Sequence, residues 1–490
     1  MFWYSLVLKI QPVVGSEVQI LRKKVSLDVA HYIILFMIFG SFLRVVGIGE
    51  YFTELASSLA GRTTGGPAKI AVISSAFIGS LIGGATSNVT ITGIFTIPMM
   101  KQYGFRTNFA AAVEAASSTG GSILPPIMGS AAFLIAEILG VTYFEVVKAS
   151  LIPAVLYYLA IMFMVHIQAV KSNLETSPNF KCPELSTTLK GAYKLLPLVI
   201  IITFLFRGYS PSFAGLAGIS SCIILGFING ANRLTLTKIF DALEWASVTV
   251  IQIVLACAAS GIIMGAVVLT GLSGKFTSIL LQVSAGVEVL VLVFIMLSTI
   301  ILGMGMAITP AYIMAAVLGA PALISLGFTP IASHLFIMYF AVLAPLTPPV
   351  AITAYVAAGI AQGNMAKTAV QALKLASVGF LIPYLFLYHN ELLLIGGTAD
   401  IIISIITAII GIICFASGVQ GFLVKRLNIY ERIAAIGGGI FVIIPSLISD
   451  LAGLLVLSIL FFTSRDVMMK SKPKTHTIKL IREGGQKGDK

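Results

Sequence analysis

Two polar, glycine-rich stretches interrupt apolar segments, and each is followed by a Pro-Pro pair. The stretches are Gly83–Thr90 (GGATSNVT) and Gly303–Pro310 (GMGMAITP), and the pairs are Pro125-Pro126 and Pro348-Pro349. Proline removes a backbone donor and glycine favours non-helical backbone, so carbonyl oxygens are freed where the helices break. Hard cations prefer such carbonyls and the side-chain oxygens of Ser, Thr and Asn. The pattern therefore predicts two cation sites within an apolar chain.

The candidate ligands follow from the residues at these interruptions. We expect one site to be formed by Gly83, Ser87, Asn88 and Gly121, and the other by Gly305, Thr309, Ala344 and Thr347. The expected side-chain ligands of these cations are Ser87, Asn88, Thr309 and Thr347. Half-helix N-termini at the same place favour an anion, so an anionic substrate is expected between the two sites. We expect a hairpin that turns back at Ser87-Asn88. The alternative for Ser87-Asn88 is a polar pair that packs membrane helices together.

Glu114 is an acid in the half-helix that leads to the first break, about two helical turns before Gly121. Ionisable residues inside membrane segments are costly and by default functional. Glu114 either carries a proton, orders the site by accepting hydrogen bonds, or is a structural charge paired within the bundle. The sequence leaves all three roles open.

The two interrupted regions repeat each other along the chain. Pro98 corresponds to Pro321, and the two Pro-Pro pairs correspond at the same offset of 223 residues. Just upstream, GIGEYFTEL from Gly47 corresponds to GLSGKFTSI from Gly271. A single Pro-Pro pair usually marks only a helix kink, but a repeated pair of broken apolar segments points to a secondary transporter with its binding site near the bilayer midplane.

Composition restricts the chain to a membrane protein. Of its 490 residues, 58% are hydrophobic and only 10% are charged, whereas soluble domains carry about 25% charged residues. Several apolar runs approach the ~20 residues that span a bilayer as a helix. The four cysteines have no CxxC spacing, which argues against a metal site and a disulfide framework. The net charge of +12 does not indicate nucleic-acid binding, because the basic residues follow a membrane pattern.

That pattern is the positive-inside rule. Most of the 31 Lys and Arg residues fall on one side if Ala30–Val46 runs from outside to inside and each repeat contains a hairpin that returns to its own side. Counting crossings, the first repeat then starts outside and the second starts inside. The expected fold is an all-α polytopic membrane protein with two inverted repeats, each with a re-entrant hairpin and a Pro-Pro-broken helix.

The expected organisation has six parts. They are an N-terminal remnant (1–25), the first inverted repeat (26–168), a cytoplasmic loop with scaffold helices (169–249), the second inverted repeat (250–390), C-terminal transmembrane helices (391–464) and a basic cytoplasmic tail (465–490).

Three long motifs resemble the large membrane subunit of tripartite ATP-independent periplasmic (TRAP) transporters, the DctM-like permeases. They are VEAASSTGGSILPPIMGSAAFLIAEILG from Val113, LGMGMAITPAYIMAAVLGAPAL from Leu302 and PLTPPVAITAYVAAGIA from Pro345. The sequence is most similar to the TAXI subgroup, in which small and large membrane subunits are fused. Fused members carry a small-subunit portion ahead of the region that matches Ser26. We expect that portion to be supplied in trans or to be missing from a shortened form.

The resemblance implies an inner-membrane permease that takes up a small organic anion, usually a carboxylate, driven by a sodium gradient or in some members by protons. It also implies a TAXI-type extracytoplasmic solute-binding protein and elevator-type motion of the hairpin-bearing domain. Leu195–Ile228 is the expected scaffold. The other interpretations are a partner-dependent subunit without transport of its own and an uncoupled facilitator. An enzyme is disfavoured, because the sequence contains no HExxH or GxSxG motif and no His-Asp cluster.

Overall fold

The computed structural model describes residues 34–174, 182–228, 233–442 and 453–459. The N-terminal remnant (1–25) and the basic tail (465–490) lie outside these residues. The described chain is built of helices, with one isolated β-bridge between Phe422 and Arg426. Five of its helices are long and apolar enough to cross a membrane, or six if the bent pair Ile34–Val46 and Ile48–Ala60 counts as one span. This confirms the expectation of an all-α polytopic membrane protein.

The first interrupted region forms a series of helices that ends in a long span. In chain order these are Ile34–Val46, α3 (Ile48–Ala60), α4 (Gly66–Ile82), α5 (Ala85–Gln102), α6 (Thr107–Gly120), the 3-10 turn η2 (Gly121–Ile123), α7 (Ala131–Leu139) and α8 (Tyr143–Lys171). The α4–α5 pair is the first predicted hairpin, and α6–η2–α7 is the first broken helix.

The second region has the same order of elements. These are α12 (Leu236–Leu269), α13 (Leu272–Val283), α14 (Glu288–Gly303), α15 (Ile308–Ser325), α16 (Pro330–Leu343), the 3-10 turn η4 (Ala344–Leu346), α17 (Ile352–Ala361), α18 (Met365–Leu375) and α19 (Ser377–Tyr388). The second hairpin, α14–α15, begins at Glu288. Phe276 belongs to the preceding helix α13.

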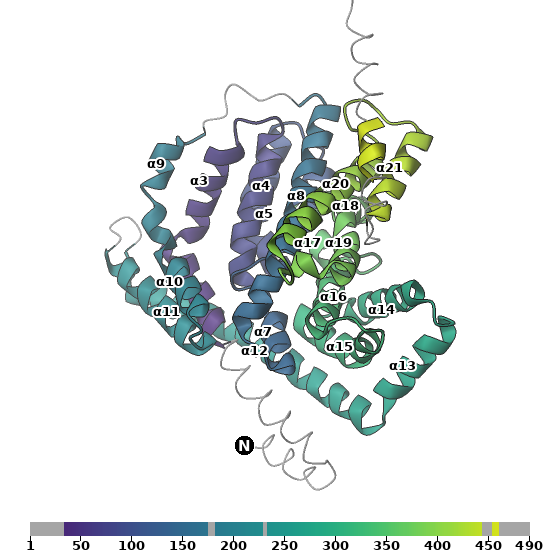
Figure 1. Cartoon of the computed structure of the whole chain (residues 1–490). Helices are drawn as coiled ribbons and strands as arrows, with labels where there is room; N and C mark the ends of the chain where they lie inside the picture. Colours follow the sequence, from purple (N-terminus) through teal and green to yellow (C-terminus); the bar gives the residue numbers. More distant parts are fainter. Residues whose placement is uncertain (1–33, 175–181, 229–232, 443–452, 460–490) are drawn as a thin grey trace, which may run out of the picture.

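The remaining helices lie between and after these two series. They are α9 (Leu185–Leu189), η3 (Ala192–Leu195), α10 (Leu196–Phe206) and α11 (Pro211–Ile228) in the middle, and η5 (Asn390–Leu393), α20 (Thr398–Gln420) and α21 (Ile429–Phe441) at the end. Figure 1 shows α3, α4, α5 and α8 side by side, α14 to α16 as a group at the opposite end, and α17 to α19 between them.

The two broken helices pack crosswise. The half-helix α6 of the first region contacts α17 and α18 of the second, while α7 contacts α15 and α16. The turns η2 and η4 also reach across, η2 to α16 and η4 to α6. Each break therefore lies against the other region, and the two breaks share one central volume.

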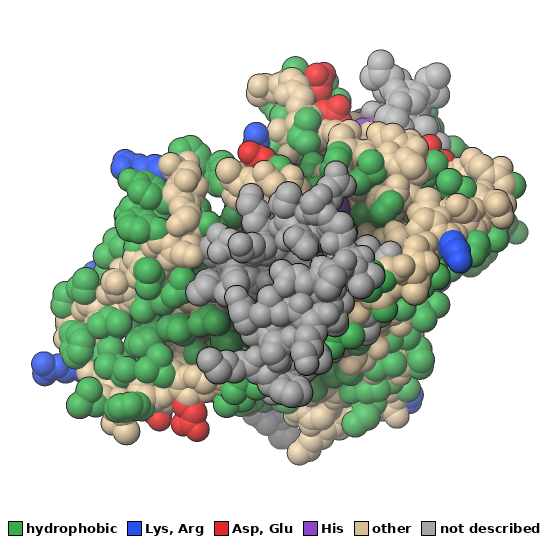
Figure 2. All heavy atoms as spheres, turned by 90° about the horizontal axis from the view of Figure 1, so that it is seen from below, with side chains coloured by type: hydrophobic (Ala, Val, Ile, Leu, Met, Phe, Trp, Pro, Cys, Tyr) green, Lys and Arg blue, Asp and Glu red, His purple; other side chains and the backbone are tan. Residues whose placement is uncertain are grey.

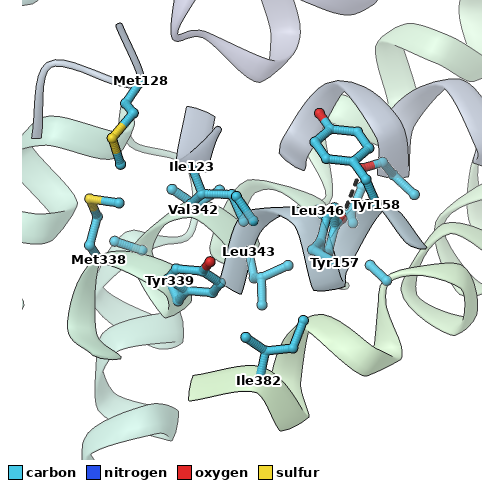
Figure 3. Close-up of a cluster of buried hydrophobic side chains, with 14 of the residues drawn as sticks. Ile123, Met128, Tyr157, Tyr158, Met338, Tyr339, Val342, Leu343, Leu346 and Ile382 are labelled. Carbon is cyan, nitrogen blue, oxygen red and sulfur yellow. Dashed lines mark hydrogen bonds between the residues drawn. The ribbon is translucent and has the colours of Figure 1, made fainter. Parts of the chain in front are cut away.

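Apolar side chains fill that central volume. Figure 3 shows Ile123 of the first break and Leu346 of the second in one cluster with Tyr157, Tyr158 and Tyr339. The Tyr157 and Tyr158 hydroxyls donate to the carbonyls of Ala116 and Ser117, each at 2.8 Å. These carbonyls lie in the last turn of α6, where helix partners run out. The tyrosines of α8 thus satisfy the end of the broken helix.

The outer surface suits a lipid environment. Large hydrophobic side chains are exposed along α10, α11 and α12, among them Val199, Phe206, Phe213, Phe227 and Phe240. Figure 2, seen from below the view of Figure 1, shows mostly hydrophobic atoms among the described residues, with Lys and Arg as isolated side chains near the margin. Lipid-facing helices have this character, because lipid chains replace water as the solvent.

A glycine substitution tests how tightly the first break is packed. A Cβ added at Gly120 would lie 2.4 Å from a ring carbon of Tyr157, whereas a Cβ at Gly359 would meet nothing within 4 Å. We expect Gly120→Ala to destabilise the protein by about 1–3 kcal/mol, the usual cost of overpacking. Gly359→Ala lies in a helix and should be neutral or stabilising by up to about 1 kcal/mol. Thermal unfolding of the purified protein in detergent measures both, and equal melting temperatures for the two variants would contradict this packing.

Candidate functional site

The first hairpin turns at Gly83-Gly84, four residues before the expected Ser87-Asn88. Helix α4 ends at Ile82, Gly83 adopts a left-handed conformation with φ 68°, and α5 starts at Ala85. The expected turn at Ser87-Asn88 is therefore wrong, because both residues lie in the first turn of α5. Their side chains project from a helix N-terminus and not from a loop.

The tip of this hairpin is joined to the first break by backbone contacts. The Ser122 hydroxyl donates to the Gly83 carbonyl at 3.0 Å, and the Met128 amide donates to the Ser80 carbonyl at 3.2 Å. A Cβ at Gly83 would lie 2.4 Å from the Met128 carbonyl oxygen, so no larger residue fits without a shift. Hairpin and break form one packed unit.

Asn88 is the one predicted side-chain ligand of this first unit that is fully buried. Its Nδ2 donates to the Ser75 carbonyl at 2.8 Å, but its Oδ1 has no hydrogen-bond partner. A Cβ at Gly79 would lie 2.5 Å from Asn88 Nδ2 and 2.7 Å from Gly121 Cα, so Asn88 and Gly121 converge on Gly79. A buried acceptor without a donor is costly, which makes Asn88 Oδ1 a candidate cation ligand.

Ser87 is half-buried, and its hydroxyl makes no hydrogen bond to another described residue. Its carbonyl accepts from the Thr90 hydroxyl at 2.7 Å. The structure thus brings Gly83, Asn88 and Gly121 to the contact between hairpin and break, with Ser87 beside them at the start of α5.

The second hairpin repeats this contact with smaller residues. Gly303, at the end of α14, would place a Cβ 2.7 Å from the Ala344 Cβ, and Gly305 lies in the following turn with φ 79°. The Thr347 hydroxyl donates to the Leu343 carbonyl at 2.9 Å, within its own broken helix. Thr299 Oγ1 in α14 is buried without a partner. Sequence reasoning missed Thr299, because it lies in a continuous apolar helix.

No hydrogen bond joins Thr309 to Thr347 among the described residues. Its hydroxyl forms a short hydrogen bond with that of Ser130, which directly precedes α7 in the first region. Thr309 stands in the first turn of α15, as Asn88 stands in the first turn of α5. The second tip therefore reaches the first break, and the expected grouping of Thr309 with the second break alone is incomplete. Ser130 was not among the predicted site residues.

The backbone of the two breaks repeats at the sequence offset of 223. After the 3-10 turns, Leu124 and Thr347 are both extended, with φ −88° and −87°. Met128 and Ala351 then both have positive φ, 61° and 34°. The predicted helix breaks Pro125-Pro126 and Pro348-Pro349 lie between these positions, and both of these peptide bonds are cis. The repeat read from the sequence is thus a repeat of conformation.

Glu114 lies at the centre of a cluster of hydroxyl groups. It is fully buried in α6 and accepts hydrogen bonds from Ser75 at 2.8 Å and Ser118 at 3.0 Å, together with short ones from Thr92 and Thr96. No basic side chain pairs with it in the described part of the chain. Three helices, α4, α5 and α6, contribute to this cluster.

The chemistry of the cluster permits two states of Glu114. A hydroxyl can donate or accept, so the four groups can solvate a carboxylate or, with one hydroxyl reversed, a protonated carboxyl. The Thr92 hydroxyl also lies 2.8 Å from the Asn88 carbonyl, which links Glu114 to the residue with the unpartnered oxygen. A buried carboxylate needs a compensating positive charge, and either a nearby cation or a proton supplies it.

Comparison with known proteins identifies the family. Residues 7–401 match the family described as "Tripartite ATP-independent periplasmic transporter, DctM component". A putative TRAP transporter large permease protein of Haemophilus influenzae is 23% identical over 73% of this chain and 84% of its own length. A C4-dicarboxylate TRAP transporter large permease protein of Vibrio cholerae is 23% identical over the same shares. The 2,3-diketo-L-gulonate TRAP transporter large permease protein of Escherichia coli is 23% identical over 67% of this chain and 76% of its own. The chain therefore belongs to the DctM family of TRAP transporter large permeases, and it is a multi-pass protein of the inner membrane.

Proposed function

We propose that this permease carries out sodium-coupled uptake of a small organic anion, delivered by a TAXI-type extracytoplasmic solute-binding protein. Membership of the DctM family implies an extracytoplasmic solute-binding protein, of unspecified type, and usually a small membrane subunit. Uptake of a carboxylate is consistent with the C4-dicarboxylate named for the Vibrio cholerae relative. The observation that carries the sodium proposal is the buried, unpartnered Oδ1 of Asn88 where hairpin and break meet.

The helix ends at the centre support a site that binds sodium ions together with an anionic substrate. Helices α4, α6, α14 and α16 end at the tips and breaks, and α5, α7, α15 and α17 begin there. Helix C-termini carry partial negative charge and attract cations, while N-termini attract anions. Carbonyls at the C-terminal ends and Asn88 Oδ1 would hold sodium, and the N-terminal ends of the paired half-helices would face the substrate carboxylate.

The proposal includes inverted repeats and elevator-type motion. Crosswise packing of α6 on α17 and of α7 on α16 supports an antiparallel relation of the two broken helices. Both hairpins and both broken helices would move as one body past a scaffold of Ile34–Val46, α10, α11 and α12. The substrate ligands lie on that body, so it must travel intact to keep the site formed.

The first prediction of this proposal concerns Asn88. Asn88→Ala should insert and fold. The sodium concentration that half-maximally activates uptake should rise by roughly tenfold, because the substitution removes one of several oxygen ligands from the site. The measurement is the sodium dependence of uptake in proteoliposomes with the cognate binding protein. Thr368→Ala is the matched control, since Thr368 Oγ1 is also buried without a partner but lies in α18. Unchanged sodium activation in Asn88→Ala would remove Asn88 from the site.

The second prediction separates sodium coupling from proton coupling, the second candidate mechanism. Glu114, with no basic partner, is the observation that favours a proton. If sodium is the coupling ion, Glu114→Gln should retain sodium-driven uptake, lowered in rate because four hydrogen bonds to a charged acceptor become weaker. Uptake driven by a pH gradient and by a sodium gradient, measured separately in wild type and variant, decides the question. Sodium coupling is contradicted if a pH gradient alone drives uptake and Glu114→Gln abolishes this uptake while substrate exchange is retained. In that case the coupling ion is a proton carried by Glu114.

The third prediction tests the moving body. The Phe36 and Phe133 rings lie 4.8 Å apart, between the proposed scaffold helix Ile34–Val46 and α7. A Phe36→Cys/Phe133→Cys pair, in a protein whose native cysteines are replaced by serine, should crosslink in a yield that changes with sodium and substrate. Ser130→Cys/Thr309→Cys joins two parts of the moving body and should crosslink equally in all conditions. A condition-independent Phe36–Phe133 crosslink that leaves transport intact would exclude the elevator motion.

A further inference from the structure

Four basic side chains gather where α8, α18 and the connection from α20 to α21 meet. Lys171 ends α8, Lys374 lies in the last turn of α18, Arg426 lies in the connection and Arg432 begins α21. Lys171 is close enough to Arg426 and Arg432 for their charges to repel, and Lys374 is likewise close to Lys171 and Arg432. Figure 1 shows α20 and α21 beside the end of α8. We call these four residues the basic cluster.

No carboxylate neutralises the basic cluster in the described part of the chain. The one ion pair found there joins Lys425 and Glu431, with 2.9 Å between nitrogen and oxygen. Glu431 is also used by the capping box of α21, in which it accepts from the Asn428 amide at 2.8 Å. Four like charges thus lie together, while Glu431, the sequence neighbour of Arg432, pairs with another lysine.

Helix capping explains only part of this arrangement. Lys171 Nζ donates to the Gln420 carbonyl at 3.1 Å and Arg432 Nε to the Gly418 carbonyl at 3.0 Å, which satisfies the negative C-terminal end of α20. Lysine has three donors and arginine five, so donors remain on both. Lys374 and Arg426 make no side-chain hydrogen bond to any residue that the structure describes, so capping gives no reason for their presence.

Exposed apolar side chains stand directly beside the cluster. Val170 precedes Lys171, Val370 lies one turn before Lys374 on α18, and Ile429 and Ile433 flank Arg432 on α21. A free inorganic anion would gain nothing from these apolar side chains, because it has no apolar surface to bury against them. A phospholipid has a phosphate for the cations and acyl chains for the apolar surface next to them.

We propose that the basic cluster binds the headgroup phosphate of an anionic phospholipid, whose acyl chains lie along the exposed faces of α18 and α21. Basic pockets between the ends of transmembrane helices on the cytoplasmic side are suited to such headgroups, and this is the side that the positive-inside pattern predicts for the cluster. Arginine binds phosphate with two parallel hydrogen bonds, and lysine adds a point charge. The lipid would fasten the C-terminal pair α20–α21 to α8 and α18.

The test uses the full chain, purified in detergent, with added phosphatidylglycerol or phosphatidylcholine. Lys374→Gln/Arg426→Gln removes two charges without touching the two residues that cap α20. Each basic residue near an anionic headgroup contributes about a factor of five in binding, so the double variant should bind phosphatidylglycerol at least about tenfold more weakly. Lys190→Gln/Lys194→Gln is the control, because it removes the same charge from the segment around η3. Native mass spectrometry counts bound lipids, and the melting temperature reports stabilisation.

The expected result is that phosphatidylglycerol, and not phosphatidylcholine, binds to and stabilises wild type and the control, while the double variant loses this response. Equal response to the two lipids in wild type would overturn the proposal, as would an equal loss in the double variant and the control. Inorganic phosphate titrated into the lipid-free protein forms a separate arm. If millimolar phosphate stabilises wild type as strongly as phosphatidylglycerol does, the site takes a free anion and the lipid assignment is wrong.

Discussion

Broken helices inside a membrane impose the constraint on which the rest of this structure depends. Each break frees backbone donors and acceptors where lipid offers no partner, so they must be satisfied by protein. At the first break, Ser122 and Met128 bond to the hairpin backbone at Gly83 and Ser80, and Tyr157 and Tyr158 bond to the end of α6. The hairpin is thus needed to complete the broken helix, and neither element is satisfied alone.

Glycine makes this mutual completion geometrically feasible. The Cα of Gly121 approaches Gly79 so closely that a Cβ on either would overlap the other backbone, and a Cβ on Gly303 would lie 2.7 Å from the Ala344 Cβ. Close backbone contact leaves no room for lipid between hairpin and break. It also makes the contact stiff, because small shifts would lose many packed atoms at once. A body held in this way can move as a unit, which is what an elevator mechanism would require of it.

The polar groups left over at the centre follow from the same constraint. Glu114 collects four hydroxyl donors, and Asn88 presents an oxygen without a donor, while Thr92 contacts both residues. If Glu114 is ionised, its carboxylate and the unpartnered Asn88 oxygen lack a compensating positive charge among the described residues. Structural burial alone does not supply that charge, whereas a bound cation or a proton does. Under the proposed function, the cluster would link the stability of the first hairpin to the bound cation.

The sequence predicted the parts of this centre that depend on local chemistry. Proline pairs and clustered glycines favour helix breaks through local backbone chemistry, so both breaks, both hairpins and the offset between them could be recognised in advance. The turn of the first hairpin was misplaced because Ser87-Asn88 looks like a loop, yet two preceding glycines already end α4. Contacts between distant segments could not be read in this way. The sequence around Thr309 does not indicate that it contacts Ser130, which lies 179 residues away in the chain.

The hydroxyl cluster around Glu114 could be predicted from the sequence only in part. Thr92 and Thr96 are four residues apart on α5, as are Glu114 and Ser118 on α6, so each pair shares one helix face. That spacing was visible in the sequence, but which two faces meet depends on how α5 packs on α6. The pairing is fixed by the hairpin tip, because Gly83 anchors α4 and α5 to the break that follows α6. Glu114 and Asn88 therefore both depend on the same hairpin–break contact for their positions, and Thr92 contacts both of them.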